Sequence, residues 1–237
     1  MRPDPAKYID LERYPIQHPN SVDYQSMLDP ITSELEEKGC AVLKGFIRQD
    51  CIAELIAEAD GVAPYAHKSF SRTNAYFTKD DSGLPNSHPS RRFYDRSNAF
   101  VPADNFSADS ILRSIYEWAD FSPFIQQALG EKEFYRYADP LADVIINVVA
   151  SGDGFPWHFD TNNFTVTLSI QSGEAGGIFQ YSPMLRSTQD ENFSSVQAVL
   201  DGDQSLIQSI QLGDGDLQIF KGRYSLHRVT AVTGGRT

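Results

Sequence analysis

The chain has 237 residues, of which 41% are hydrophobic and 22% charged, and its formal net charge is −12. These values are typical of a soluble globular protein with one sizeable core. The acidic balance argues against a large phosphate-binding surface, so we do not expect nucleic acid as a partner. No apolar run is long enough to span a membrane, and the N-terminus lacks the apolar segment of a secretory signal. Two cysteines, Cys40 and Cys51, do not make a disulfide framework, which favours a cytoplasmic location.

The first quarter of the chain predicts helices and one strand. Residues 1–22 are polar and rich in proline, so we expect an arm on the surface. Residues 22–39 predict a helix that is interrupted near Pro30 and ends at Gly39. Two further elements follow: a strand at 40–46, and a helix at 50–61 with an aspartate at its start and Gly61 at its end.

The segment 62–108 does not show a regular pattern. It is rich in Pro, Ser, Asn, Arg and aromatic residues, and a loop of this length in a compact domain is usually functional or disordered. The aromatic residues favour packing, so we interpret the segment as a lid or wall. Residues 109–130 then predict one helix or two, with Pro123 marking the break.

After residue 130 the chain changes to short strand-like runs separated by Gly, Asp, Asn and Pro turns. A helix at about 190–200 interrupts them. The runs are EFYRYA, DVIINVVA, NFTVTLSIQ, GIFQYS, SLIQSIQL, GDLQIFKG and LHRVTAV. Helices followed by many short strands predict a single α+β domain over 1–237, with N-terminal helices and lid at 1–130 and a β-sandwich or jelly roll at 131–237.

The stretch PWHFDTNN carries a candidate metal site. In an extended strand, residues i and i+2 point to the same face, so His158 and Asp160 share a face. His227 lies on a later predicted strand, and strands far apart in sequence become neighbours in a jelly roll. Two histidines and one carboxylate form the ligand set of non-haem Fe(II) oxygenases. Phe155 and Trp157 are our candidates for an apolar wall beside the metal and for substrate contact.

An arginine near the C-terminus completes the pattern. Arg236 follows His227 beyond a Gly234–Gly235 turn, which would return the chain as an antiparallel neighbour of the His227 strand. An arginine in this place can form a bidentate pair with a carboxylate near the metal. Arg228 is adjacent to His227 and therefore points to the opposite face, where we expect an ion pair on the outer surface.

Several other residues are weaker candidates. Asn147 and Thr165 can face an oxoacid or substrate, although structural roles are open for both. Asn162 and Arg91 are candidates for substrate contact, with ordinary surface charge as the alternative for the arginine. We expect surface positions for His18 and His88, leave His67 open between pocket and surface, and expect Asp190–Asn192 to form the first turn of a helix.

A family resemblance rests on these motifs. HFD (158–160), GDLQIFKGRYSLHRVTAV and Arg236 resemble the Fe(II)/2-oxoglutarate-dependent dioxygenase superfamily, which is built on a double-stranded β-helix; the matching region runs from about 135 to 237. YADPLADVIINVV, WHFDTNNFTVTLSIQ and GRYSLHRVT resemble more closely the group that includes the free-lysine radical halogenases and their hydroxylase relatives. Halogenases of that group carry Gly or Ala in place of the carboxylate, so Asp160 makes this sequence similar to the hydroxylases.

The resemblance implies an activity. Fe(II) would be held by His158, Asp160 and His227, 2-oxoglutarate would chelate the iron and pair with Arg236, and O2 would be the co-substrate. The implied reaction is hydroxylation of an unactivated C–H bond in a free amino acid or similar small polar metabolite. Desaturation, demethylation and a non-catalytic cupin-like binding protein are the alternatives. The superfamily usually continues beyond the arginine strand, whereas this chain ends one residue after Arg236, so it is either trimmed or closes its barrel differently.

Overall fold

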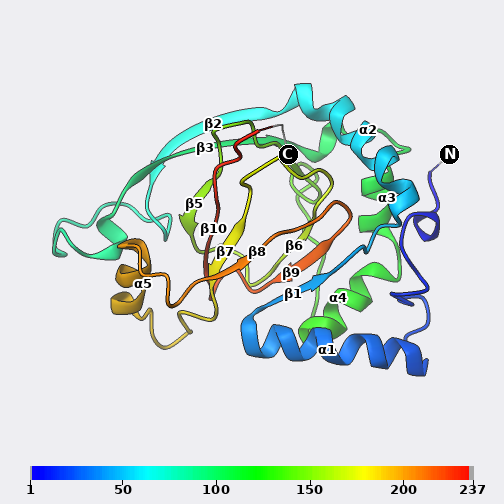
Figure 1. The fold of residues 1–237 in the computed structure, drawn as a ribbon, viewed down its shortest axis with the longest axis horizontal. Helices are drawn as coiled ribbons and strands as arrows, with labels where there is room; N and C mark the ends of the chain where they lie inside the picture. The colour runs from blue at the N-terminus through cyan, green and yellow to red at the C-terminus, as the bar shows by residue number, and fades with distance from the viewer. Residues whose placement is uncertain (1, 235–237) are drawn as a thin grey trace.

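The computed structural model describes residues 2–234 and is built of helices and antiparallel strands (Figure 1). The helices are α1 (Val22–Lys38), α2 (Ile52–Val62), α3 (Ile111–Glu117), α4 (Phe121–Leu129) and α5 (Phe193–Leu200). The strands are β1 (Cys40–Leu43), β2 (His67–Thr73), β3 (Tyr94–Val101), β4 (Ile146–Asn147), β5 (Phe155–His158), β6 (Thr165–Leu168), β7 (Phe179–Ser182), β8 (Gln208–Ile210), β9 (Leu217–Phe220) and β10 (Leu226–Val229). The α+β class is therefore confirmed. No helix within the described range is long and apolar enough to cross a membrane.

Two sheets face each other around an aromatic core. One has the strand order β1-β9-β6 and the other β5-β10-β7-β8. Phe179 and Tyr181 of β7 meet Phe220 of β9, with ring centroids 5.0 and 5.6 Å apart, and Cys40 of β1 joins the same buried cluster. The contact of side chains from both sheets makes the core a β-sandwich.

The N-terminal helices cover the other face of the β1-β9-β6 sheet. All four residues of β9 are buried, which the two-residue period of a strand explains. Leu217 and Ile219 belong to the large apolar cluster that includes α1 and α4, whereas Phe220 belongs to the cluster between the sheets. The helical layer therefore buries the outer face of the sheet, and Figure 1 shows α1 and α4 along this side.

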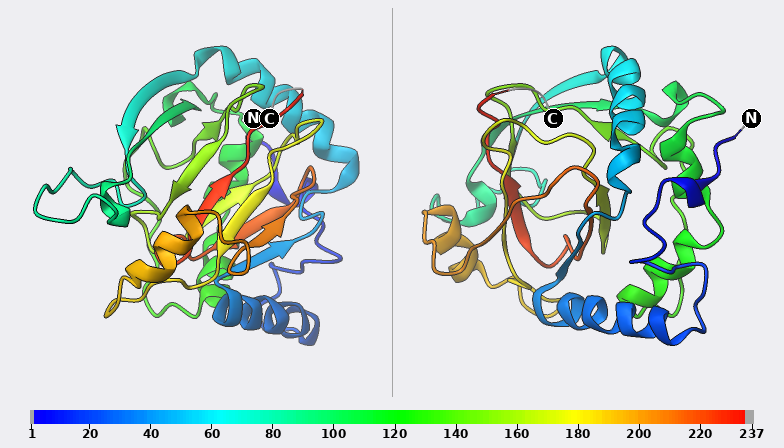
Figure 2. Two further views of the ribbon diagram at one scale, coloured as in Figure 1. Left: turned by 60° about the vertical axis from the view of Figure 1, so that its left-hand side comes forward. Right: turned by 45° about the vertical axis from the view of Figure 1, so that its right-hand side comes forward.

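The expected loop at 62–108 is instead dominated by a long hairpin. Strands β2 and β3 pair over seven positions, from His67 opposite Phe100 to Thr73 opposite Tyr94, and β3 continues into a short pairing with β4. The hairpin curves over the sandwich (Figures 1 and 2). Nearly every β2 side chain is exposed, so the strand lacks the apolar alternation by which strands are found in a sequence. The prediction of irregular structure was wrong for this reason.

Two prolines lie inside helices instead of interrupting them. Pro30 is within α1, where its missing N–H leaves the carbonyl of Ser26 without a helical donor. Both residues are exposed, so water can solvate that carbonyl. Pro123 is the third residue of α4, and N–H groups of a first turn have no helical partner in any case. The break between α3 and α4 lies at residues 118–120 instead.

The boundaries of other helices and strands also differ from the predicted ones. Helix α1 ends at Gly39 as predicted, since this residue is left-handed at φ 67°. Helix α2 runs past Gly61 to Val62. Residues 133–138 form no strand, and DVIINVVA contributes only the two residues of β4. Residues 190–192 precede α5 instead of forming its first turn, because Asn192 is itself left-handed at φ 48°.

The turn before β9 contains a buried carboxylate that gives a stability prediction. Asp216 accepts hydrogen bonds from Lys44 Nζ (2.7 Å), Gly45 N (2.8 Å) and Gly213 N (2.7 Å). Burial raises its pKa, but these hydrogen bonds outweigh burial and the net pKa is lowered. We expect Asp216→Ala to reduce the free energy of unfolding by about 2 kcal/mol at pH 7.

The pH dependence follows from the direction of that shift. A carboxyl whose folded pKa is depressed stabilises the fold above its unfolded pKa of about 3.9 and loses this contribution as pH falls through the folded pKa. Urea unfolding of the two proteins should therefore differ down to about pH 4, and the difference should shrink below it. Asp29→Asn, an exposed change on α1, should stay within about 0.5 kcal/mol of wild type. A pH-independent gap would contradict the role of the ionised carboxylate.

Candidate active site

Pairing of β5 with β10 brings the predicted ligands together. His158 lies directly opposite His227 in this antiparallel pair, and their ring centroids are 4.2 Å apart. Asp160 Oδ1 is 3.6 Å from His158 Nε2 and 3.4 Å from His227 Nε2. One ligand atom from each residue can be chosen so that all three lie within 4.8 Å of one another. The three side chains therefore converge on one point, as two of them were predicted to do from the i, i+2 spacing.

Each imidazole is oriented by its own strand. His158 Nδ1 is 2.7 Å from the carbonyl oxygen of Pro156, and His227 Nδ1 is 2.9 Å from that of Ser225. A carbonyl only accepts, so both Nδ1 atoms carry the hydrogen, and the lone pair is left on Nε2. Nε2 is the atom that faces Asp160 in both rings. Metal-binding histidines have this arrangement, in which the second nitrogen donates to an outer partner.

The protonation states suit a divalent cation. Burial, assisted by the neighbouring His227, lowers the pKa of His158 to about 3, so this ring is neutral at physiological pH. Burial raises the pKa of Asp160, but its interactions with His227, His158 and Thr165 outweigh burial and lower the pKa overall. A neutral imidazole and an ionised carboxylate are the forms that bind metal.

Asp160 is held from its second oxygen. Thr165 Oγ1 donates to Asp160 Oδ2 at 2.8 Å, and the backbone N–H of Asp160 donates to Gly222 O at 3.0 Å. Thr165 was predicted as a candidate for contact with the oxoacid or substrate. The structure places its hydroxyl on the carboxylate of Asp160, in agreement with the structural role that the sequence left open.

Three phenylalanines form the apolar surroundings of the imidazoles. Phe77 lies 5.7 Å from the His158 ring, and Phe220 and Phe179 lie 4.7 and 5.8 Å from the His227 ring, measured between centroids. Trp157 was predicted to supply this wall. It instead lies under the guanidinium of Arg228 at 4.7 Å, on the opposite face of the sheet, because neighbouring residues in a strand alternate.

A β-bulge places the two predicted wall residues, Phe155 and Trp157, on opposite faces of the sheet. The pairing of β10 with β5 runs from His227–His158 to Val229–Phe155, so β5 carries one extra residue between these pairs. Paired residues share a face, which puts Phe155 on the face of His227. Arg228 makes no outer ion pair with any residue of 2–234, contrary to expectation; its Nε donates to Gln180 Oε1 at 2.8 Å and its charge lies over Trp157.

The hairpin contributes a charged residue that sequence reasoning missed. Arg96 on β3 is half-buried, and its guanidinium carbon lies 5.2 Å from the ring centroid of Phe77. Burial lowers its pKa, and electrostatic interactions with Tyr94 and Asp160 act in the opposite direction. Its Nε atom is buried and has no hydrogen-bond partner within residues 2–234. Arg96 is therefore a half-buried cation near the predicted ligands, with a buried Nε donor that no described residue uses.

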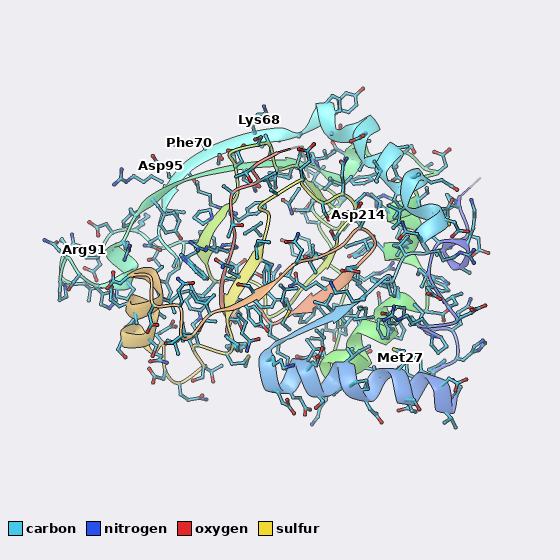
Figure 3. The ribbon with its side chains drawn as sticks, in the orientation of Figure 1. Met27, Lys68, Phe70, Arg91, Asp95 and Asp214 are labelled. Atoms are coloured by element: carbon cyan, nitrogen blue, oxygen red, sulfur yellow. The ribbon has the colours of Figure 1, made fainter. Side chains whose placement is uncertain are left out.

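The same face of β3 carries further polar groups. Asn98, two residues from Arg96, has a buried Oδ1 without a hydrogen-bond partner among the described residues. Tyr94 donates from its hydroxyl to the carbonyl of Trp157, which ties the hairpin to β5. Figure 3 shows Lys68, Phe70 and Asp95 on the outer side of the hairpin. The alternation of side chains then turns Tyr94, Arg96 and Asn98 inward.

The loop that follows β2 is ordered by one buried amide. Asn74 is fully buried; its Nδ2 donates to the carbonyl of Thr78 at 3.1 Å, and its Oδ1 accepts from Tyr76 N at 2.9 Å. Phe77 is left-handed at φ 54°, a conformation that costs a non-glycine residue of order 1 kcal/mol. The Asn74 bonds hold this conformation and with it the ring that contacts His158.

Comparison with known families decides the relationship. The model of the family HalD, described as Halogenase D, matches residues 24–237. The chain belongs to the HalD family. No curated protein sequence matches the chain.

The fold of this HalD chain is shared with solved 2-oxoglutarate–Fe(II) oxygenases. An oxidoreductase of the 2OG-Fe(II) oxygenase family from Burkholderia pseudomallei has a TM-score of 0.52 at 14% identity, covering 88% of this chain and 86% of the other. A Trichoplax adhaerens prolyl hydroxylase has 0.54 at 12%, covering 90% and 86%. The epimerase SnoN, in complex with Fe3+, alpha ketoglutarate and nogalamycin RO, has 0.54 at 13%, covering 89% and 80%.

The remaining candidates of the HalD chain are dispersed. Asn147 is exposed on β4 opposite Phe100, and Asn162 is exposed in the turn after Asp160. Arg236 lies outside the described residues. The structure brings neither asparagine into a hydrogen bond with the ligand set.

Arg91 is engaged by its own loop. Its guanidinium bonds Asp80, the carbonyl of Leu84 and the side chain of Asn86, and Figure 3 shows it far from the sandwich. It lines an open groove of about 570 Å³ with Arg72, Asp80, Arg92 and Phe93. Among the other histidines, His18 and His67 are exposed, whereas His88 is half-buried against Phe193, at 4.4 Å between centroids, which corrects its predicted surface position.

Proposed function

We propose that this chain is an Fe(II)- and 2-oxoglutarate-dependent dioxygenase that hydroxylates an unactivated C–H bond of a free amino acid or similar small polar metabolite. The observation that carries the proposal is the convergence of two imidazole Nε2 atoms and one carboxylate oxygen within 4.8 Å. Two histidines and one carboxylate with open positions opposite suit non-haem Fe(II). We further propose that the two facing sheets form the double-stranded β-helix of this superfamily. We also propose that the protein acts in the cytoplasm.

The residues divide the work. His158, Asp160 and His227 would hold the iron, which with 2-oxoglutarate and O2 supplies the oxidising chemistry and yields succinate and CO2. Phe77, together with Phe179 and Phe220, lines the imidazoles with rings and so excludes water from the metal's surroundings. Arg236 is our candidate for the distal carboxylate of 2-oxoglutarate.

Asp160 favours hydroxylation within a family named for a halogenase. The Asp160 carboxylate, which accepts a hydrogen bond from Thr165, would fill the coordination position that a halide would need. Removing the carboxylate would be required before chloride could take its place. Halogenation is therefore the least favoured outcome for this chain.

Arg96 supports a substrate that carries a carboxylate. The buried Nε of Arg96 has no polar partner among residues 2–234, which is costly unless a ligand completes it, and arginine is suited to bidentate recognition of a carboxylate. Asn98 adds an unused acceptor on the same face of β3. A free amino acid, with its carboxylate on Arg96, matches this lining, and we propose that the α-carboxylate binds there.

The direct test is anaerobic addition of Fe(II) and then 2-oxoglutarate to metal-free protein. We expect the weak visible charge-transfer band of the chelate in wild type and its loss in His158→Ala, because the variant lacks one of three ligands. His18→Ala, at an exposed position, should keep the band. Succinate release across a panel of amino acids would then identify the substrate. Iron binding without a band would favour the metal-binding, non-catalytic alternative, and no metal binding would refute the site.

A further inference from the structure

A glycine in the β9–β10 connection lies against the carboxylate of Asp160. A Cβ atom built on Gly222 would be 1.9 Å from Asp160 Oδ2 and 2.6 Å from its Cγ. These distances are below any that real Cβ atoms show. The φ angle of Gly222 is outside the left-handed range, in contrast to Gly39 at +67°. Glycine is needed at 222 for space, not for its backbone conformation.

The backbone at Gly222 cannot retreat from the carboxylate without breaking other contacts. Its carbonyl accepts the N–H of Asp160 at 3.0 Å, and the N–H of Lys221 donates to Gly39 O at 2.7 Å. The carbonyl of Lys221 also accepts the backbone N–H of Tyr224 at 3.1 Å. The main chain on both sides of Gly222 is thus hydrogen-bonded, so an added methyl group would displace the carboxylate instead of the main chain.

Thr165 constrains the same oxygen from another strand. It belongs to β6, where it pairs with Phe220 of β9, and its hydroxyl donates to Asp160 Oδ2 at 2.8 Å. Gly222 and Thr165 therefore both act on Oδ2. Oδ1 is the oxygen that faces the Nε2 atoms of His158 and His227.

We infer that Gly222 and Thr165 form a carboxylate clamp that holds Asp160 as a one-oxygen metal ligand. Gly222 supplies the space that the carboxylate occupies, and Thr165 supplies the hydrogen bond that turns Oδ2 away from the metal. The clamp rests on the metal centre proposed above. Two residues outside the ligand triad would thus decide whether the Asp160 carboxylate reaches the metal.

The test uses Co(II) as the probe and the full-length chain. We expect Gly222→Ala to weaken Co(II) binding at least 10-fold and to shift the visible Co(II) spectrum toward that of Asp160→Gly, since outer contacts of metal ligands are worth about 10- to 100-fold in affinity. In the Asp160→Gly background, Gly222→Ala should change the affinity less than twofold. A purely structural defect would weaken binding equally in both backgrounds, and that result would overturn the clamp.

Thr165 gives an independent arm that does not depend on the folding of Gly222→Ala. Thr165→Val should weaken Co(II) binding about 10-fold, Thr165→Ser should restore it, and both differences should vanish without the Asp160 carboxylate. Gly61→Ala is the matched control, because a Cβ there meets nothing within 4 Å. If wild type does not bind Co(II), the metal centre itself fails; if it binds and neither clamp variant differs from wild type, the clamp alone fails.

Discussion

Asp160→Gly is expected to reduce the proposed hydroxylation at least about 100-fold. Loss of an outer contact to a metal ligand already costs 10- to 100-fold, and this change removes the ligand itself. The variant should retain weaker metal binding through His158 and His227, whose rings are oriented by Pro156 and Ser225 independently of Asp160. Hydroxylated product and succinate would be measured together, because succinate release without product would show that the two half-reactions had become uncoupled.

Chloride gives the same variant a second readout. The vacated coordination position should let chloride change the visible spectrum of the Co(II)-loaded variant, whereas wild type should be insensitive to it. Asp203→Gly, in an exposed turn after α5, should behave as wild type in both assays. Undiminished hydroxylation by Asp160→Gly would remove this residue from the ligand set.

Arg96→Met is expected to raise the KM for the proposed amino-acid substrate at least about 30-fold. Truncating one partner of a buried, hydrogen-bonded charge pair costs 2–5 kcal/mol, and methionine keeps most of the bulk over Phe77. Arg96→Lys should recover only part of the loss, because a lysine cannot make the bidentate contact. Arg72→Met is the matched control, since Arg72 is exposed and pairs with Asp95, whose side chain is on the outer side of the hairpin.

A decarboxylated analogue separates recognition of the substrate from other effects. Wild type should prefer the amino acid to the corresponding amine, and Arg96→Met should lose most of that preference. In Arg96→Met, the visible charge-transfer band that forms with Fe(II) and 2-oxoglutarate under anaerobic conditions should be the same as in wild type. A raised 2-oxoglutarate requirement with an unchanged KM for the amino acid would place Arg96 on the cosubstrate instead.

The convergence of His158, Asp160 and His227 could be predicted because its information is local. The i, i+2 spacing of His158 and Asp160 gives a shared face where the chain is extended, and His227 needed only a second strand. The prediction that Trp157 forms the wall was wrong because side chains alternate along a strand, and Trp157 lies between two inward positions. The bulge that returned Phe155 to the inner face depends on how β5 pairs with β10, which the sequence of β5 alone does not encode.

Arg96 and the hairpin that carries it could not be predicted from the sequence, for a different reason. Strand prediction relies on one buried and one exposed face, and β2 is exposed along nearly its whole length. Without a strand at β3, Arg96 is one arginine among several in a polar segment. The role of Gly222 was hidden as well, because the contact that requires it joins residues far apart in the chain.

The tethering of each imidazole to a carbonyl two residues earlier has a consequence for assembly. His158 and His227 acquire their aim from three-residue segments, so the rings are oriented as soon as their strands form. The pairing of β5 with β10 then brings the two oriented rings opposite each other, and the contacts of Asp160 with Thr165 and Gly222 add the carboxylate before any ion arrives. We expect the apoprotein to fold fully and to be reconstituted after purification by simple addition of metal, without a denaturation step.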